Sequence, residues 1–122
     1  MTKRRLTITL NPDWHTALRK AGAHAGAANY QGEVLNFESP SAFFTRLSDK
    51  RWALLHALQG QGEMAVRELA RRVGRDVKRV HEDVVTLCEL GLVERAATGA
   101  VLCPFAEVHI DMRLRATTAQ AA

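Results

Sequence analysis

Acid–base or metal chemistry needs titratable side chains at suitable spacing, and this chain offers one such pair. Its 122 residues include five histidines, two cysteines and 13 acidic residues, but the histidines are scattered and repeat no metal-ligand spacing. His109 and Asp111 differ, because they are two residues apart in an alternating segment and would share one face of a strand. They could form an acid–base or metal pair, but a sheet-surface pair or an interface is the commoner use of such residues. We therefore expect no catalytic residue, no cofactor and no bound metal.

A cluster of basic side chains offers a second kind of chemistry, the binding of an anion. The formal net charge is +4, and the basic residues are concentrated rather than spread evenly. Between positions 67 and 79 only Glu68 and Asp76 oppose the basic residues, which are Arg67, Arg71, Arg72, Arg75, Lys78 and Arg79. Guanidinium and ammonium groups bind phosphates, and they can also contact the edges of guanine in the major groove.

Hydrophobic spacing predicts two helices that would carry this cluster. The first begins near Ala65 or Val66 and ends at Gly74, because glycine allows the left-handed conformation common after a helix. The second follows the N-cap residue Asp76 and has apolar residues along one face: Val77, Val80, Val84, Leu87 and Cys88. We expect this face to be buried against four leucines, Leu54, Leu55, Leu58 and Leu69.

Two earlier helices and a later hairpin complete a recognisable order. Ser39-Pro40 predicts the start of a short helix, and Ser48 predicts the cap of the next one. After the basic helices, "LVERA" and "AVLC" flank a turn with glycine and predict a hairpin. Two helices, a turn with glycine, a further helix and then a hairpin is the order of a winged helix-turn-helix.

Three further segments predict a sheet outside this order. "RLTITL" and "EVLNFES" predict strands on either side of a helix that begins at Asn11-Pro12, and "EVHIDMRL" alternates apolar and charged residues. Their apolar residues should build a sheet that either stays within one chain or also joins two protomers as a homodimer: Leu6, Ile8, Leu10, Val108, Ile110, Met112 and Leu114.

The expected fold is therefore α+β, a winged helix-turn-helix with an added N-terminal strand–helix–strand segment. We divide the chain into residues 1–39, for dimerisation or partner binding, residues 40–115, for DNA binding, and residues 116–122, a frayed tail.

Three motifs in sequence resemble a family of small prokaryotic winged-helix proteins described as predicted transcriptional regulators. The motifs are "KRxxLLxAL" at residues 50–58, "RELARRxGRDVKxVHxDVxxLxxxGLxE" at residues 67–94, and a proline followed by "VHIDxxL" within residues 104–114. The resemblance implies binding to double-stranded DNA, and some relatives look like the antitoxin halves of toxin–antitoxin pairs. One departure is Ala65, which stands where relatives tend to have a serine cap, so the helix after it is expected to start less firmly.

Position along the helices divides the candidate DNA contacts into two groups. Contacts in the major groove are assigned to Arg75, Lys78, Arg79 and Glu82. Contacts with phosphates are assigned to Arg67, Arg71, Arg72 and Arg95.

Other interpretations of these residues stay open. The helix charges could serve solubility through pairs four residues apart, Lys78 with Glu82 and Arg79 with Asp83. The chain could also be an antitoxin, or another protein-binding module, that neutralises a toxin and regulates its own operon. RNA binding is a third candidate, although the chain has no aromatic RNA-recognition motif. Because no apolar run approaches the roughly 18 residues that span a membrane and nothing marks export, we expect a cytoplasmic protein with no membrane partner.

Overall fold

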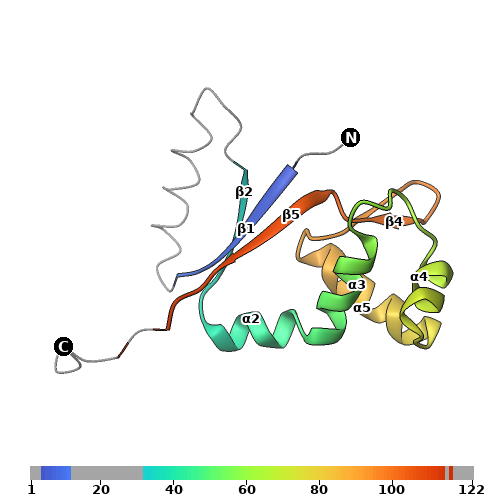
Figure 1. Cartoon of the computed structure of the whole chain (residues 1–122). Coiled ribbons are helices and arrows are strands. Elements are labelled where there is room, and N and C mark those ends of the chain that lie inside the picture. The colour runs from blue at the N-terminus through green and yellow to red at the C-terminus, as the bar shows by residue number, and fades with distance from the viewer. Residues whose placement is uncertain (1–3, 12–31, 115, 117–122) are drawn as a thin grey trace.

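The fold is α+β, with a three-stranded sheet toward one end of the molecule and α4 and β4 at the other (Figure 1). The computed structural model describes residues 4–11, 32–114 and 116. The elements are β1 (Arg4–Leu10), β2 (Glu33–Phe37), α2 (Pro40–Arg46), α3 (Asp49–Leu58), α4 (Val66–Val73), α5 (Val77–Glu89), β3 (Glu94–Arg95), β4 (Val101–Leu102) and β5 (Phe105–Asp111). The helix predicted to begin at Asn11-Pro12 lies outside the described residues, as does the predicted tail apart from Ala116.

β1 is the central strand of the sheet, and both of its neighbours run parallel to it. Ile8 lies opposite Leu35 of β2 on one side and opposite Ile110 of β5 on the other. Leu6 and Ile8 are buried, as the alternating pattern of this strand predicts. The three predicted strands are thus confirmed, and they form a sheet within one chain, although β5 stops three residues before the predicted end.

The sheet and the helices share one hydrophobic core. Phe37 of β2 meets Phe43 of α2 edge to face, with ring centroids 5.4 Å apart. Arg4 of β1 lies over the ring of Phe105, 5.0 Å from its centroid, and pairs with Glu94 of β3 at 3.3 Å. The strands of residues 1–39 therefore pack on the same core as residues 40–115.

A tight turn at Gly74 sets the path from α4 to α5. Gly74 has the left-handed dihedral angles φ 68° and ψ 38°, and its N–H donates to the carbonyl of Arg71. The N–H of Arg75 donates to the carbonyl of Ala70, so the last carbonyls of α4 are satisfied by the turn. Asp76 then caps α5 by accepting a hydrogen bond from the N–H of Arg79 at 3.3 Å. The predicted turn and cap are confirmed.

The hairpin of β3 and β4 is anchored to the segment that precedes α4. Met64 and Val101 exchange two backbone hydrogen bonds, of 2.8 and 2.9 Å. The paired segments of the hairpin are only two residues long each, which is shorter than the sequence pattern predicts. Ala65 makes no side-chain cap for α4, so the Met64–Val101 pair is what fixes the chain just before that helix.

The buried face of α5 follows its apolar spacing from Val80 onward, but the prediction is wrong for Val77, which begins the helix and is 43% exposed. Val80, Val84 and Leu87 are all fully buried, and so are the leucines expected opposite them. Val85, one residue along the helix from Val84, is 40% exposed. The phase of α5 therefore separates a core face from a solvent face within one turn.

Val84→Asp should unfold the domain or leave it barely stable. The new carboxylate would be buried without a partner, which costs about 4 kcal/mol out of a stability that is typically about 5–15 kcal/mol. Thermal and urea denaturation followed by circular dichroism measure the loss.

Val85→Asp is the matched control, because the same change falls on the solvent face. It should shift the free energy of unfolding by no more than about 0.5 kcal/mol. Equal losses in the two variants would contradict the phase of α5.

Candidate nucleic-acid interface

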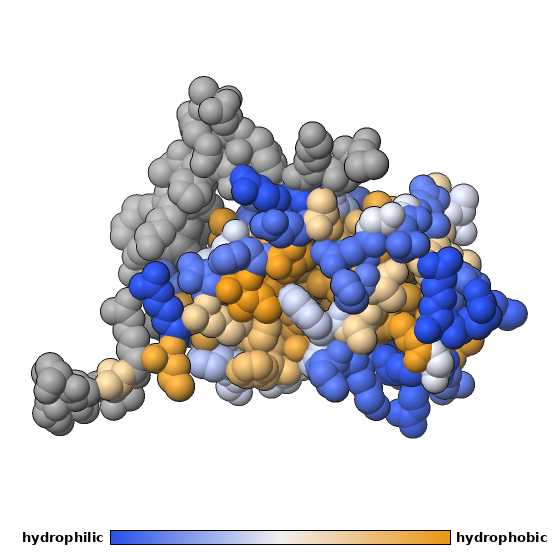
Figure 2. All heavy atoms as spheres, viewed as in Figure 1, coloured by the Kyte–Doolittle hydropathy of each residue, from blue (hydrophilic) through white to orange (hydrophobic). Residues whose placement is uncertain are grey.

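The N-terminal half of α5 presents a basic side to solvent. Lys78 and Arg79 are exposed, and neither side chain forms an ion pair with any residue in the described ranges. The pairs that spacing allowed within this helix, Lys78 with Glu82 and Arg79 with Asp83, are therefore not formed. Hydrophilic surface covers α4 and the start of α5 at the right end of the view in Figure 2.

Unlike the cations of α5, two of the arginines of α4 share a carboxylate. Arg71 and Arg72 approach Glu68 at 2.5 and 2.8 Å. Hydrogen bonds from Arg71 and then Arg72 lower the pKa of Glu68 to about 2, so this carboxylate stays ionised at neutral pH. Arg67 is exposed and has no such partner among the described residues. Among the described residues, a single carboxylate, that of Glu68, thus opposes the three guanidinium groups of α4.

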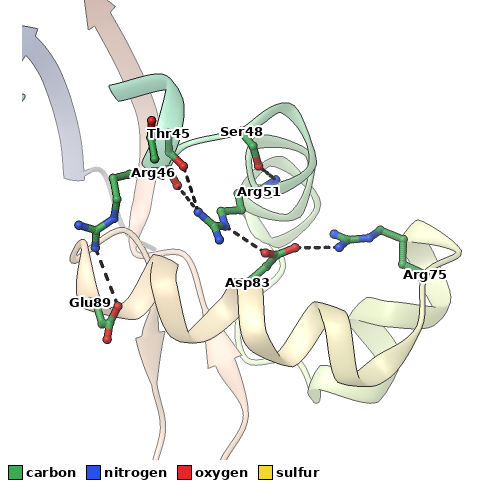
Figure 3. Close-up of polar contacts among 7 residues, drawn as sticks. All are labelled: Thr45, Arg46, Ser48, Arg51, Arg75, Asp83 and Glu89. Carbon is green, nitrogen blue, oxygen red and sulfur yellow. Dashed lines mark hydrogen bonds and ion pairs between the residues drawn. The ribbon is translucent and has the colours of Figure 1, made fainter. Parts of the chain in front are cut away.

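Arg75 lies inward, unlike the other predicted contacts. Its Nη2 donates to Oδ2 of Asp83 at 2.8 Å, and its side chain is only 21% exposed. Its Nη1 is buried and has no hydrogen-bond partner among the described atoms. Figure 3 shows this side chain reaching from the turn toward the middle of α5.

Asp83 receives a second guanidinium from another helix. Nε of Arg51, in α3, donates to Oδ1 of Asp83 at 3.0 Å (Figure 3). Nη1 of Arg51 also donates to the carbonyls of Thr45 and Arg46, at 3.4 and 2.9 Å, where α2 ends. One carboxylate therefore connects α5 with α3, with the end of α2 and with the turn after α4.

The ionisation of Asp83 is favoured by these partners despite its surroundings. Burial alone would raise the pKa of Asp83, but hydrogen bonds from Arg75 and Arg51 outweigh burial and hold the pKa below its ordinary value. The side chains of Arg51 and Asp83 are only 23% and 15% exposed, so solvent weakens these ion pairs little.

The hairpin contributes one exposed guanidinium. Arg95 lies in β3, and its Nη1 donates to the carbonyl of Gly99 at 3.3 Å, across the connecting turn. This contact orients the side chain along the hairpin without neutralising it. Arg95 is thus exposed beside the helices.

Sequence reasoning missed the network at Asp83. Asp83 lies between Val80 and Val84 in the sequence, next to the buried face, and that position could have signalled a charge needing a partner from another element. Nothing in the sequence identified Arg51 as that partner, because the contact spans 32 residues. The structure thus brings Arg67, Arg71, Arg72, Lys78, Arg79, Glu82 and Arg95 to the surface and turns Arg75 inward.

Across residues 4–11, 32–114 and 116, three or more His, Cys, Asp or Glu side chains never gather closely enough to hold a metal ion. The helices in those ranges include none that is both long and apolar enough to cross a membrane. Burial raises the pKa values of the two thiols, Cys88 and Cys103, which are free.

Comparison with known proteins matches the chain to a protein family. A protein-family model described as HVO_A0114 matches residues 46–110, more than half of the 122-residue chain. The matched region runs from the end of α2 through the hairpin and most of β5. No curated protein matches the chain.

Asp83→Asn should lower the free energy of unfolding by about 3 kcal/mol at neutral pH, because it keeps the shape but leaves two partly buried guanidinium groups without a counter-charge. Since the folded state lowers the pKa of Asp83, its stabilisation is present above the unfolded pKa of about 4 and is lost as the pH falls further. Urea denaturation between pH 7 and pH 3 should show a smaller acid loss in the variant.

Glu82→Gln is the control for this measurement. It removes the neighbouring charge from an exposed position and should change stability by no more than about 0.5 kcal/mol. If the two variants unfold alike, Asp83 does not organise the helices.

Proposed function

This chain belongs to the HVO_A0114 family, and we propose that it is a sequence-specific, double-stranded DNA-binding transcriptional regulator. In this proposal α3, α4 and α5 with the β3–β4 hairpin act as a winged helix-turn-helix. α5 enters the major groove, and regulation follows from occupancy of an operator rather than from any chemical reaction.

The observation that carries the proposal is the pair of unpartnered cations on the first turns of α5. Lys78 and Arg79 follow directly after the Gly74 turn and the Asp76 cap, and both point to solvent without a described ion pair. A recognition helix contacts base edges with its N-terminal residues. The burial of Val80, Val84 and Leu87 leaves the opposite side of the helix free to enter a groove.

The remaining charges support a division of roles. Arg67, Arg71 and Arg72 on α4 and Arg95 on the hairpin flank α5 in the sequence and are proposed phosphate contacts. Glu82 is exposed one turn beyond Lys78, where a carboxylate can accept a hydrogen bond from cytosine. Arg75 is proposed to position the turn through Asp83 instead of reading a base.

Binding to DNA should weaken steeply with salt, because each neutralised phosphate releases counterions. Four phosphate contacts per protomer give a slope of log K against log salt of about −3.6 and a loss of roughly 100-fold between 50 and 200 mM. Fluorescence anisotropy on duplexes selected from a random library measures the slope. A flat salt response, or no binding at low salt, would contradict the proposal.

Arg79→Ala and Arg71→Ala should differ in kind. Loss of a base contact at Arg79 should cost about 1–3 kcal/mol and relax the preference at one base pair. Loss of a phosphate contact at Arg71 should weaken binding to all DNA sequences alike. It should also reduce the slope of log K against log salt by about 1. Selection from the same random library compares the preferred sites of the two variants with that of the natural chain.

Both substitutions fall on exposed side chains, so each protein should stay folded, which circular dichroism checks. If both variants lose affinity equally on every sequence, Arg79 is not a base contact.

A further inference from the structure

The outer edge of β5 carries charged and apolar residues that have no partner among the described residues. β5 is an outer strand of the sheet, and beyond it no further strand is paired in the described ranges. Glu107, His109, Asp111 and Arg113 are exposed, and none makes an ion pair or a side-chain hydrogen bond with a described residue. Ile110 shares a face with the buried Ile8 yet is 37% exposed. An open strand edge of this kind readily pairs with another chain.

The charges along this strand are complementary to themselves when the strand is reversed. In an antiparallel pair centred on Ile110, Glu107 meets Arg113 of the second copy, and His109 meets Asp111. Two-fold symmetry repeats each contact, so two Glu–Arg ion pairs and two His–Asp contacts form on one face. On the other face Ile110 lies opposite Ile110 of the second copy, and Val108 lies opposite Met112 of the second copy. Directly opposite side chains of these kinds stabilise antiparallel strands.

Neighbouring registers are worse on the same grounds. Centring the pair on His109 places Glu107 against Asp111, two like charges. Centring it on Asp111 places that carboxylate against its own copy and His109 against Arg113. Centring it on Val108 leaves Asp111 opposite the buried Phe105. Among these registers, only the one centred on Ile110 pairs Glu107 with Arg113 and Asp111 with an imidazole.

A hollow beside β5 fits the same register. It has a volume of about 260 Å³, lies between α3 and β5, and has Trp52, Leu55, Ala106 and Val108 in its walls. Leu114 is fully exposed. In the register centred on Ile110, Leu114 of the second copy comes level with Ala106, where β5 shifts its register against β1 and the hollow opens. An exposed leucine is thus brought to an unfilled hollow whose walls are partly apolar and also include His56, Gln59 and Glu107.

We propose that β5 pairs antiparallel with β5 of a second copy of this chain, with the two-fold axis at Ile110. The two sheets then join into one, residues 112–114 extend the strand, and each Leu114 enters the hollow of its partner. The occupant of the edge is a second copy because the charge pattern is self-complementary. The inference does not depend on DNA binding and is tested without DNA.

Charge reversal on one side of the pair tests the register. Glu107→Arg and Arg113→Glu should each raise the dimer dissociation constant by about tenfold or more, because each homodimer then holds like charges face to face. An equimolar mixture of the two variants should recover the affinity of the natural chain, because both contacts of the mixed dimer are again of opposite sign.

Light scattering and analytical ultracentrifugation of the full chain measure these constants. Glu63→Arg, an exposed reversal in the loop before α4, is the control and should not change dimerisation. A natural chain that stays monomeric at about 100 µM would overturn the proposal and leave the edge to a different protein. The proposal would also be overturned if neither charge reversal changed the dimer dissociation constant. The same holds if the mixture of the two variants did not recover the affinity of the natural chain.

A cysteine at the axis gives an independent readout. In this register Ile110→Cys places two thiols opposite each other, with Cα atoms about 4.5–5.5 Å apart, within the range a disulfide spans. Mild oxidation should cross-link this variant into a covalent dimer. His109→Cys should cross-link poorly, because residue 109 faces residue 111 of the second copy. Equal cross-linking at both positions, or none at 110, would refute the register. A dimer with this interface but no affinity for DNA would refute only the proposed function.

Discussion

The carboxylate of Asp83 is the group on which the arrangement of the helices depends most. The apolar core selects the buried face of each helix and sets how close the helices pack, but its contacts are not directional. The two guanidinium groups at Asp83 are directional, since each oxygen has its own donor from a different element. Removing one member of such a group leaves the others buried and uncompensated, so the three side chains act as a unit. The direction in which Lys78 and Arg79 face follows from the buried face of α5 together with these contacts.

The charges of the helical region fall into two populations that total charge does not distinguish. Arg51 and Arg75 pair with the partly buried Asp83, whereas Arg71 and Arg72 pair with Glu68 on the surface. A shared carboxylate limits the rotamers of both arginines, so less side-chain entropy is left to lose when they bind an anion. The net charge of +4 therefore does not show which of the positive charges are free to bind an anion.

Local signals predicted the elements well. Ser39, Ser48, Asp76 and Gly74 mark helix ends through contacts of at most five residues, which a sequence displays directly. The alternation in β1 and β5 predicted a sheet but did not say which strands would pair or in what direction, because pairing depends on residues about 100 positions apart. Arg75 looked like a base contact. Its spacing matches the basic cluster, and only its contact with Asp83, eight residues on, reveals that it turns inward.

The central place of β1 also sets an order of events for a growing chain. The contacts among α3, α4 and α5 are between neighbours in sequence, so these helices can assemble as soon as they are made. β1 is made first, yet one of its two partners is β5, near the other end, and the parallel pairing closes a loop of nearly the whole chain. Such long closures are slow because chain entropy is lost before contacts are gained. The pairing of β1 with β5 is therefore expected to form last. Until β5 arrives, one edge of β1 stays open.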